Sequence, residues 1–346
     1  MSRRQPATTT PSPTLWWGAG VAVAVGALLS LPRVLDPYDV LQLSVILILS
    51  MLALSEGFLW GFVGILSFGQ TTFFGLGGYA YAVTALNVGH TELALLGAVL
   101  LAAVFAALVG YFMIYGRISN VYLGVITLVI TLILEKLMRA TSSDEWVIGS
   151  VRLNGQNGIP TVPSLDIPFL HGTFDLAGVY YISIGCLAVI YVGLRLLLAT
   201  HFGRVCVGIR ENEVRAELLG YDSRIYKLTA FVLAGAVAGF SGALFGIWGN
   251  FVSPDMFSLS QSAQILIWVI VGGRTTLVGP IIGCALVQYL TSYLGAAAVG
   301  QVTLFLGLIL MVAVLAFRQG LVPTLALLPS WFQRRSATTG EPRGGR

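Results

Sequence analysis

Charge is scarce in this chain. Aspartate, glutamate, lysine and arginine make up 10% of its 346 residues, whereas 56% are hydrophobic and the mean hydropathy is +0.86. A soluble domain carries about 25% charged residues. This composition excludes a water-soluble globular protein. It predicts an all-α polytopic membrane protein, because helices satisfy their own backbone hydrogen bonds inside a bilayer.

Motifs for catalysis and nucleotide binding are also missing. The chain contains no GxxxxGK[ST] P-loop and no Gly-Lys dipeptide, and neither HExxH nor GxSxG occurs. We therefore expect no ATP site of the P-loop type and no enzymatic activity on this chain. The three cysteines, Cys186, Cys206 and Cys284, are far apart and form no CxxC pair, so neither a disulfide framework nor a zinc site is predicted. We also expect no cofactor and no other metal on this chain.

What the chain has instead is a series of apolar stretches. About 20 apolar residues suffice for a helix to cross a bilayer. Ten candidates are present: 15–31, 40–60, 71–89, 93–115, 119–138, 176–198, 226–248, 261–273, 277–295 and 301–317. We expect some of them to be broken or re-entrant, because 261–273 is short and 71–89 follows a glycine-rich segment. Residues 1–14 are rich in Pro and Thr and predict a disordered N-terminus. A transmembrane domain at 15–322 and a tail at 323–346 complete the predicted organisation.

Lysine and arginine are distributed unevenly over the loops of this topology. With the N-terminus inside the cell, ten spans place all but four of the 19 basic residues on that same side. The four are Arg33, Lys136, Arg139 and Arg152. This bias agrees with the positive-inside rule and predicts that both termini are cytoplasmic. The net charge of +4 thus concerns topology, and we expect no nucleic-acid partner.

A compact charged loop, residues 200–227, interrupts the apolar chain. The spacing predicts one short amphipathic helix whose apolar face comprises Val207, Val214 and Leu218. Gly220 is placed to end this helix in a left-handed cap, and Asp222 or Ser223 to begin the next one. On the predicted topology the loop is cytoplasmic, so it could contact an aqueous partner. The alternative is a helix that lies passively on the membrane surface.

Glycines follow one face of the span at 226–248. Their spacing is four, three, four and three residues, which places them on one side of a helix and predicts close packing of a second helix. They are Gly235, Gly239, Gly242, Gly246 and Gly249. A smooth glycine face would also let helices slide or rock.

A few polar residues lie inside the apolar stretches. Such groups are costly at membrane depth unless they face a bundle interior or a pathway. The candidates for a translocation path are Glu56, Gln70, Thr71, Thr72 and Gln264. An interhelical hydrogen bond is the simpler role for Gln70. Glu56 could instead be the ion or proton site of a secondary transporter that works alone. A membrane-embedded enzyme would need clustered acidic or His residues, but the three histidines are separated in sequence.

Three segments of the chain resemble a known family. They are GFVGILSFGQTTFFGLGGYA, GRVCVGIRENEVRAELLGYDSRIYKLTAFVLAG and IWVIVGGRTTLVGPIIG, and they occur in the family's order between Val40 and Val322. They are similar to the inner-membrane permease subunits of branched-chain amino acid ABC importers. The segment GGRTTLVGP and the Trp60-Gly61 pair are more similar to the urea-importing branch of this family. The chain departs from the family at Glu56, at Gly57, where an amide is frequent, and at Gln70, where His is frequent.

The resemblance implies a multi-pass permease of the bacterial inner membrane and an assembly around it. A second related permease, two cytoplasmic ATPases that bind ATP and Mg, and an external solute-binding protein would be its partners, with membrane lipid around it. The charged loop would be the coupling helix. The residues implied in ATPase coupling are Arg210, Glu211, Glu213, Arg215, Glu217 and Gly220. The solute would be a branched-chain amino acid, urea or a short amide, and Asn154–Ile159 would lie near the binding protein.

Overall fold

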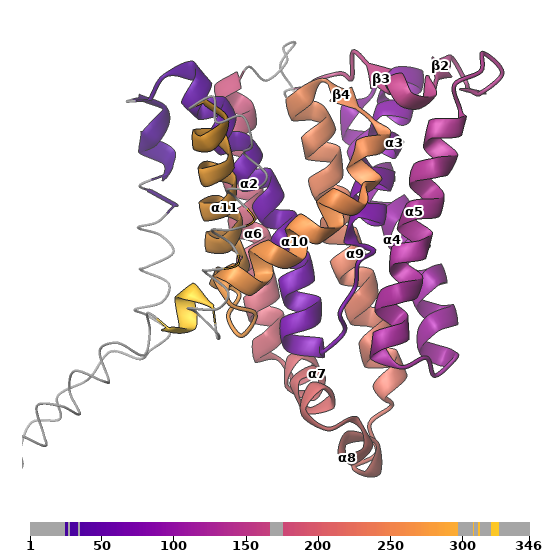
Figure 1. The fold of residues 1–346 in the computed structure, drawn as a ribbon, viewed down its shortest axis with the longest axis vertical. Coiled ribbons are helices and arrows are strands. Elements are labelled where there is room, and N and C mark those ends of the chain that lie inside the picture. The colour runs from indigo at the N-terminus through magenta and orange to yellow at the C-terminus, as the bar shows by residue number, and fades with distance from the viewer. Residues whose placement is uncertain are drawn as a thin grey trace, which may run out of the picture.

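The computed structural model describes residues 25, 26, 28–33, 35–166, 176–296, 307, 311 and 320–324, and most of them are helical (Figure 1). The helices are α2 (Pro37–Phe58), α3 (Gln70–Val88), α4 (Thr91–Tyr115), α5 (Asn120–Ala140), α6 (Leu176–Ala199), α7 (His201–Glu211), α8 (Glu213–Leu218), α9 (Ser223–Gly249), α10 (Leu259–Gly272) and α11 (Val278–Ala296). A π-helical turn, Leu59–Val63, continues α2. The all-α polytopic class is therefore confirmed for the described part of the chain.

Six of the described helices are long and apolar enough to cross a membrane: α2 with its π-helical turn, α4, α5, α6, α9 and α11. They correspond to six of the ten predicted spans. The predicted spans 71–89 and 261–273 do form helices, α3 and α10, but neither is among the six. With 14 residues, α10 is only about 21 Å long, too short for a full crossing. The remaining two, 15–31 and 301–317, lie largely outside the described residues, as do both termini, so ten spans stay a prediction.

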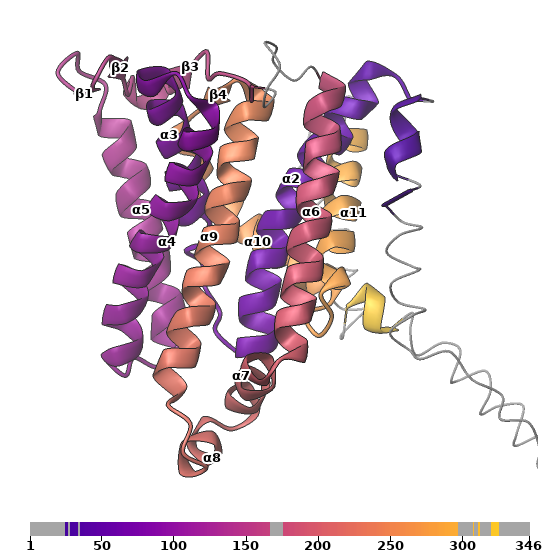
Figure 2. The same ribbon diagram turned by 180° about the vertical axis from the view of Figure 1, so that it is seen from behind.

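Helix α2 forms the centre of the bundle. Within its most apolar window 89% of residues are buried, against 33% for α4 and 22% for α5, although all three are strongly hydrophobic. The helices packed against α2 are α6, α9, α10 and α11. Figures 1 and 2 show α3, α4, α5 and α9 on one side of the molecule and α6 and α11 on the other, with α10 running obliquely between them. The apolar outer faces of α4 and α5 are those expected of helices in contact with lipid.

Small residues join α9 to its neighbours. Alanines recur at every fourth position along α4 and are fully buried, and they are Ala94, Ala98, Ala102 and Ala106. The glycines of α9 meet this alanine row and the backbone of α3. A Cβ atom at Gly235 would lie 2.6 Å from that of Ala106, and one at Gly242 would collide with the carbonyl of Phe74. Gly249, by contrast, has no atom of the described residues within 4 Å of such a Cβ atom.

The chain between α2 and α3 is not helical. Gly64 has a positive φ of 84°, which ends the π-helical turn, and residues 64–69 then run through the interior to the start of α3 at Gln70. The positive φ favours glycine, because a side chain strains this conformation. Helix α3 consequently begins inside the bundle, as expected of a broken helix.

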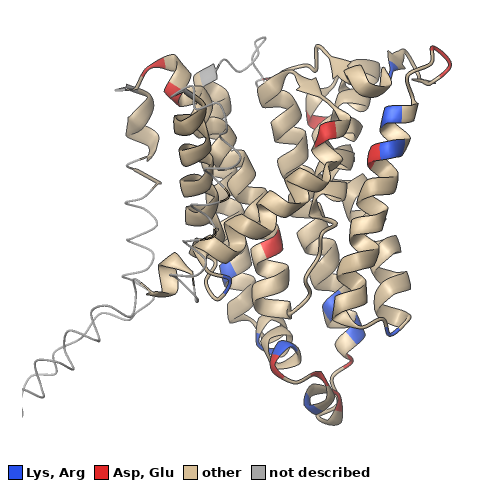
Figure 3. Ribbon diagram, viewed as in Figure 1, with Lys and Arg blue, Asp and Glu red and all other residues tan. Residues whose placement is uncertain are grey.

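Short strands cover the end of the bundle opposite α7 and α8 (Figure 1). Strand β1 (Val147–Ile148) pairs with β2 (Val151–Arg152), and β3 (Ile159–Pro160) pairs with β4 (Phe251–Val252), both antiparallel. Figure 3 shows the charged residues gathered mainly at the two ends of the molecule, with a dense group on α7 and α8. This separation is expected when the middle of the bundle lies in hydrocarbon.

Candidate functional site

The charged loop folds into two helices, so the prediction of a single helix is wrong. Helix α7 ends at Glu211, and Asn212 adopts an extended conformation with φ −160° and ψ 100°. The Asn212 side chain then accepts a hydrogen bond from the backbone N–H of Arg215 at 2.9 Å. Asparagine is among the preferred residues at this capping position. Its cap begins α8, and Val207 is thereby separated from Val214 and Leu218.

Helix α8 projects beyond the membrane helices as the most distant part of the charged loop (Figures 1 and 2). Three apolar side chains of α8 and its C-cap are exposed: Val214 to 66%, Leu218 to 83% and the C-cap Leu219 to 72%. Gly220 follows with φ +91°, and the N–H of Tyr221 reaches back to the carbonyl of Ala216 at 3.2 Å, which completes the predicted left-handed helix end. The predicted start of the next helix is also confirmed, since Asp222 accepts from the N–H of Arg224 at 3.0 Å.

The acidic residues of the charged loop hold α8 against α9. Glu213 forms an ion pair with Lys227 at 2.6 Å, and Lys227 is nearly buried. The carboxylate of Glu217 accepts a hydrogen bond from the Ser223 hydroxyl at 2.6 Å. Arg215 is exposed on α8. These side chains therefore fix the position of the helix that presents the three apolar residues.

Arg210 points in a different direction from the rest of the charged loop. Its Nη1 donates to the backbone carbonyl of Gly61 in the π-helical turn, and its Nη2 pairs with the carboxylate of Glu211. Arg274, which follows α10, lies over the Trp60 ring with 5.3 Å between the guanidinium carbon and the ring centroid. The end of α7 is thus joined to the place where the central helix breaks.

A buried polar cluster surrounds the broken segment 64–69. It comprises Ser55, Glu56, Ser67, Gln70, Thr71, Thr72, Thr127, Thr131 and Ser262, all at most 2% exposed. Glu56 Oε1 accepts from the N–H of Ser67 at 3.1 Å, and Gln70 Oε1 accepts from Ser55 at 3.3 Å. Of the residues predicted for the path, Glu56, Gln70, Thr71 and Thr72 meet here. Sequence reasoning missed the five Ser and Thr hydroxyls, although Thr127 and Thr131 are one helical turn apart on α5.

Two atoms of the buried polar cluster have no partner within the described part of the chain. They are Glu56 Oε2 and Gln70 Nε2. Most buried polar atoms in proteins are hydrogen-bonded, and an unpaired one costs about 1–3 kcal/mol. The Glu56 and Gln70 side chains also interact with each other, which partly compensates both atoms inside the cluster.

The cluster lies near the middle of the membrane helices. The carbonyl of Phe68 accepts from Thr131 at 3.3 Å and from Ser262 at 3.1 Å. Thr131 is near the centre of the 21-residue helix α5. Ser262, which also bonds Thr71 at 2.7 Å, places the first half of α10 at the same depth.

Gln264 lies apart from this cluster. Gln261 and Gln264 are both partly exposed, whereas Ser262 between them is buried. Neither glutamine side chain has a hydrogen-bond partner among residues 35–166 and 176–296. An outward face of α10 near membrane mid-depth therefore carries two unpaired amides.

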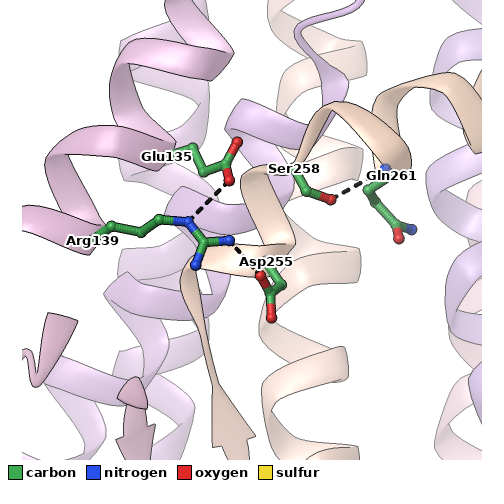
Figure 4. Close-up of polar contacts among 5 residues, drawn as sticks. All are labelled: Glu135, Arg139, Asp255, Ser258 and Gln261. Carbon is green, nitrogen blue, oxygen red and sulfur yellow. Dashed lines mark hydrogen bonds and ion pairs between the residues drawn. The ribbon is translucent and has the colours of Figure 1, made fainter. Parts of the chain in front are cut away.

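Charged residues also meet at the end of α5 opposite the charged loop (Figure 4). Arg139 lies between two carboxylates, with its Nε 3.0 Å from Glu135 and its Nη2 2.6 Å from Asp255. Asp255 belongs to the 3-10 turn Pro254–Phe257, which precedes α10. Sequence reasoning missed this group because Asp255 lies 116 positions from Arg139, although Glu135 and Arg139 are one helical turn apart. It ties α5 to the start of α10 at the end opposite the charged loop.

The acidic residues of these arrangements do not gather into a metal-binding group. Among the described residues, no group of three or more His, Cys, Asp or Glu side chains could hold a metal ion. What the geometry defines is a polytopic membrane protein with a broken helix, a buried polar cluster and a projecting aqueous loop. That combination is characteristic of a transport protein.

Comparison with known proteins identifies the family. Residues 40–315 match the family described as "Branched-chain amino acid transport system / permease component". The chain is 31% identical over 263 residues to the high-affinity branched-chain amino acid transport system permease protein LivM of Escherichia coli strain K12, which covers 68% of this chain and 58% of the relative. It is 32% identical over 241 residues to the protein of the same description from Salmonella typhimurium, covering 62% and 53%.

A more distant relative is the probable branched-chain amino acid transport permease protein LivM of Methanocaldococcus jannaschii, 23% identical over 216 residues, with 58% of this chain and 60% of the relative covered. No solved structure matches the chain. The chain belongs to the family of branched-chain amino acid transport permease components. It spans less than two thirds of the length of these curated relatives.

Proposed function

We propose that this chain is the membrane-spanning permease subunit of an ATP-driven importer. Two ATPase subunits that bind ATP and Mg dock on the cytoplasmic end, and a solute-binding protein delivers the solute on the other. The solute is a branched-chain amino acid, and urea or a short amide is the alternative solute to test. The multi-pass inner-membrane location and the cytoplasmic position of both termini belong to the same proposal.

The projecting helix α8 is the observation that carries this proposal. Val214, Leu218 and Leu219 are exposed, although exposed apolar groups clustered beyond a bundle are costly in water. Glu213 and Glu217 hold α8 rigidly on α9, so it is a fixed element. A rigid apolar projection of this kind in the aqueous phase can bind in an apolar cleft on a cytoplasmic partner. The chain has no P-loop of its own, and the partner would supply the energy.

The outward face of α10 supports a second permease subunit. Gln261 and Gln264 lie near membrane mid-depth without side-chain partners among the described residues, and hydrocarbon offers them none. A second permease packed on this face would cover them or enclose a water-filled path with them. The buried polar cluster on the inner side of α10 would then adjoin that path.

Co-purification and reconstitution test the proposal. The permease, expressed in its own host, is expected to co-purify with a protein that carries Walker motifs. Vesicles containing the whole complex should accumulate solute only with ATP and the binding protein. Repeated isolation of the chain alone, together with ATP-independent uptake, would contradict the proposal.

The alternative is an ion- or proton-coupled transporter that works through Glu56, and one observation favours it. Glu56 is fully buried, and its Oε2 makes no hydrogen bond of standard geometry among the described residues. In that case the purified chain alone should take up solute under a pH or sodium gradient, and Glu56→Gln should abolish the response to that gradient. An unchanged response in Glu56→Gln would remove the basis of this alternative.

A further inference from the structure

The contact between Arg210 and the π-helical turn joins the charged loop directly to the end of the central helix. A helix leaves its last carbonyl groups without partners inside the helix. At the end of α2 the carbonyl of Gly61 receives its hydrogen bond from the Arg210 guanidinium. The Arg210 side chain is only 30% exposed, and Glu211 holds its other edge. The guanidinium is therefore fixed in orientation at the point where the central helix breaks.

Arg210 and the π-helical turn are closely packed against each other. A Cβ atom added to Gly64 would lie 2.8 Å from Cγ of Arg210 and 3.3 Å from its Cβ. A Cβ atom at Gly61 would collide with the carbonyl of Arg274 on the other side. Closely packed groups transmit displacement, because neither can move without displacing the other. A movement of α7 must therefore break the bond to Gly61 or carry the π-helical turn with it.

The segment that follows Gly64 ends in the buried polar cluster. Its backbone is held by side chains from two spans, because Ser67 N–H bonds Glu56 at 3.1 Å and Phe68 N–H bonds Thr127 at 3.2 Å. The carbonyl of Phe68 in turn accepts hydrogen bonds from Thr131 of α5 and Ser262 of α10. Displacement of the π-helical turn would thus reach α2, α5 and α10 within a few residues.

We propose that Arg210 is the positioning residue that transmits movement of the charged loop to segment 64–69, and through it to the buried polar cluster. This inference rests on the proposed function, since the movement is attributed to the ATPase. Arg210 then acts inward on the broken helix, while α8 makes the contact with the partner. Gly64, which ends the turn with a positive φ, faces Arg210 directly and leaves no room for a Cβ atom there.

The test is Arg210→Ala in the complete reconstituted complex. We expect assembly and ATP hydrolysis to persist, while solute taken up per ATP falls roughly tenfold or more, as for loss of a charge-assisted hydrogen bond. Hydrogen exchange of the peptide 59–69 supplies a second readout. Its exchange should change on nucleotide binding in the unmodified complex and become insensitive to nucleotide in Arg210→Ala. Uptake per ATP equal to that of the unmodified complex, or a retained nucleotide response, would overturn the inference.

Two further variants complete the experiment. Arg204→Ala removes the same charge from the same loop, but among the described residues the Arg204 side chain bonds only the nearby carbonyl of Ala199, at 2.9 Å, so uptake per ATP should not change. Arg210→Lys serves if the alanine variant does not assemble, because Lys cannot hold Gly61 and Glu211 together. If solute uptake per ATP in Arg210→Lys falls below that of the unmodified complex, the inference is supported. If it equals that of the unmodified complex, the inference is overturned.

Failure of the proposed function would look different. The unmodified complex would then show no ATP-driven uptake at all. The contact itself can still be tested without nucleotide, because Arg210→Ala should raise the exchange rate of peptide 59–69 in the full chain. An unchanged rate there would overturn the role of Arg210 whatever the energy source.

Discussion

Leu218 offers the most direct test of the ATPase-docking surface. It is 83% exposed on the projecting helix α8, so nearly the whole side chain is available to a partner. Burying a leucine side chain contributes about 2 kcal/mol. Leu218→Ser should therefore weaken binding of the ATPase subunits by roughly 30-fold, since each 1.4 kcal/mol is a factor of ten. The permease should keep its own stability to within about 0.5 kcal/mol, because an exposed side chain contributes little to folding.

The assay is titration of the permease complex in nanodiscs with purified ATPase subunits, accompanied by thermal unfolding of each variant. Ile148→Ser is the matched control, because Ile148 is a 52% exposed apolar residue on β1 at the opposite end of the molecule. It should leave ATPase binding unchanged. An affinity change of less than threefold for Leu218→Ser would refute the assignment of α8 as the docking element.

Four substitutions and one labelling reaction form three further tests of the packing. Gly242→Leu should prevent folding or cost more than about 3 kcal/mol by overpacking against α3, whereas Gly249→Leu, with open space, should be tolerated in thermal unfolding. Glu56→Leu removes the acceptor of the Ser67 N–H and should lower stability by about 1–3 kcal/mol, while Glu56→Gln keeps an acceptor and should not. Burial raises the pKa of the Cys206 thiol to about 12, so maleimide should label it at pH 7–8 only after unfolding. The unfolded thiol ionises first, so this residue's contribution to stability should be lost as pH rises from about 9 toward 12.

The sequence pattern predicts most of the helices but not where they break. Apolar length suffices for the six long spans, and Asp222 and Gly220 act as the helix boundaries expected of them. The break at Asn212 was missed because Val207, Val214 and Leu218 fit one continuous periodicity. The capping preference of Asn was the available signal against it. Local spacing alone does not decide between these two interpretations.

Tertiary contacts explain why the site was only partly predictable. Polar residues inside apolar stretches pointed to Glu56, Gln70, Thr71 and Thr72, which do meet. Arg139 and Asp255 are 116 positions apart, and nothing in the pattern of either segment indicates the other. Arg210 was expected to serve the ATPase together with its neighbours in sequence. Its contact with Gly61, 149 positions away, depends on how α7 folds back under α2.

Two surfaces of this protein are mismatched to their surroundings in opposite ways. Leu218 and its neighbours on α8 are apolar where the chain leaves the bundle, and Gln261 and Gln264 on α10 are polar near membrane mid-depth. Water penalises the first surface and hydrocarbon the second. A partner that removed only one mismatch would leave the other uncompensated. The two surfaces together therefore favour an assembly with one partner in the aqueous phase and another within the membrane.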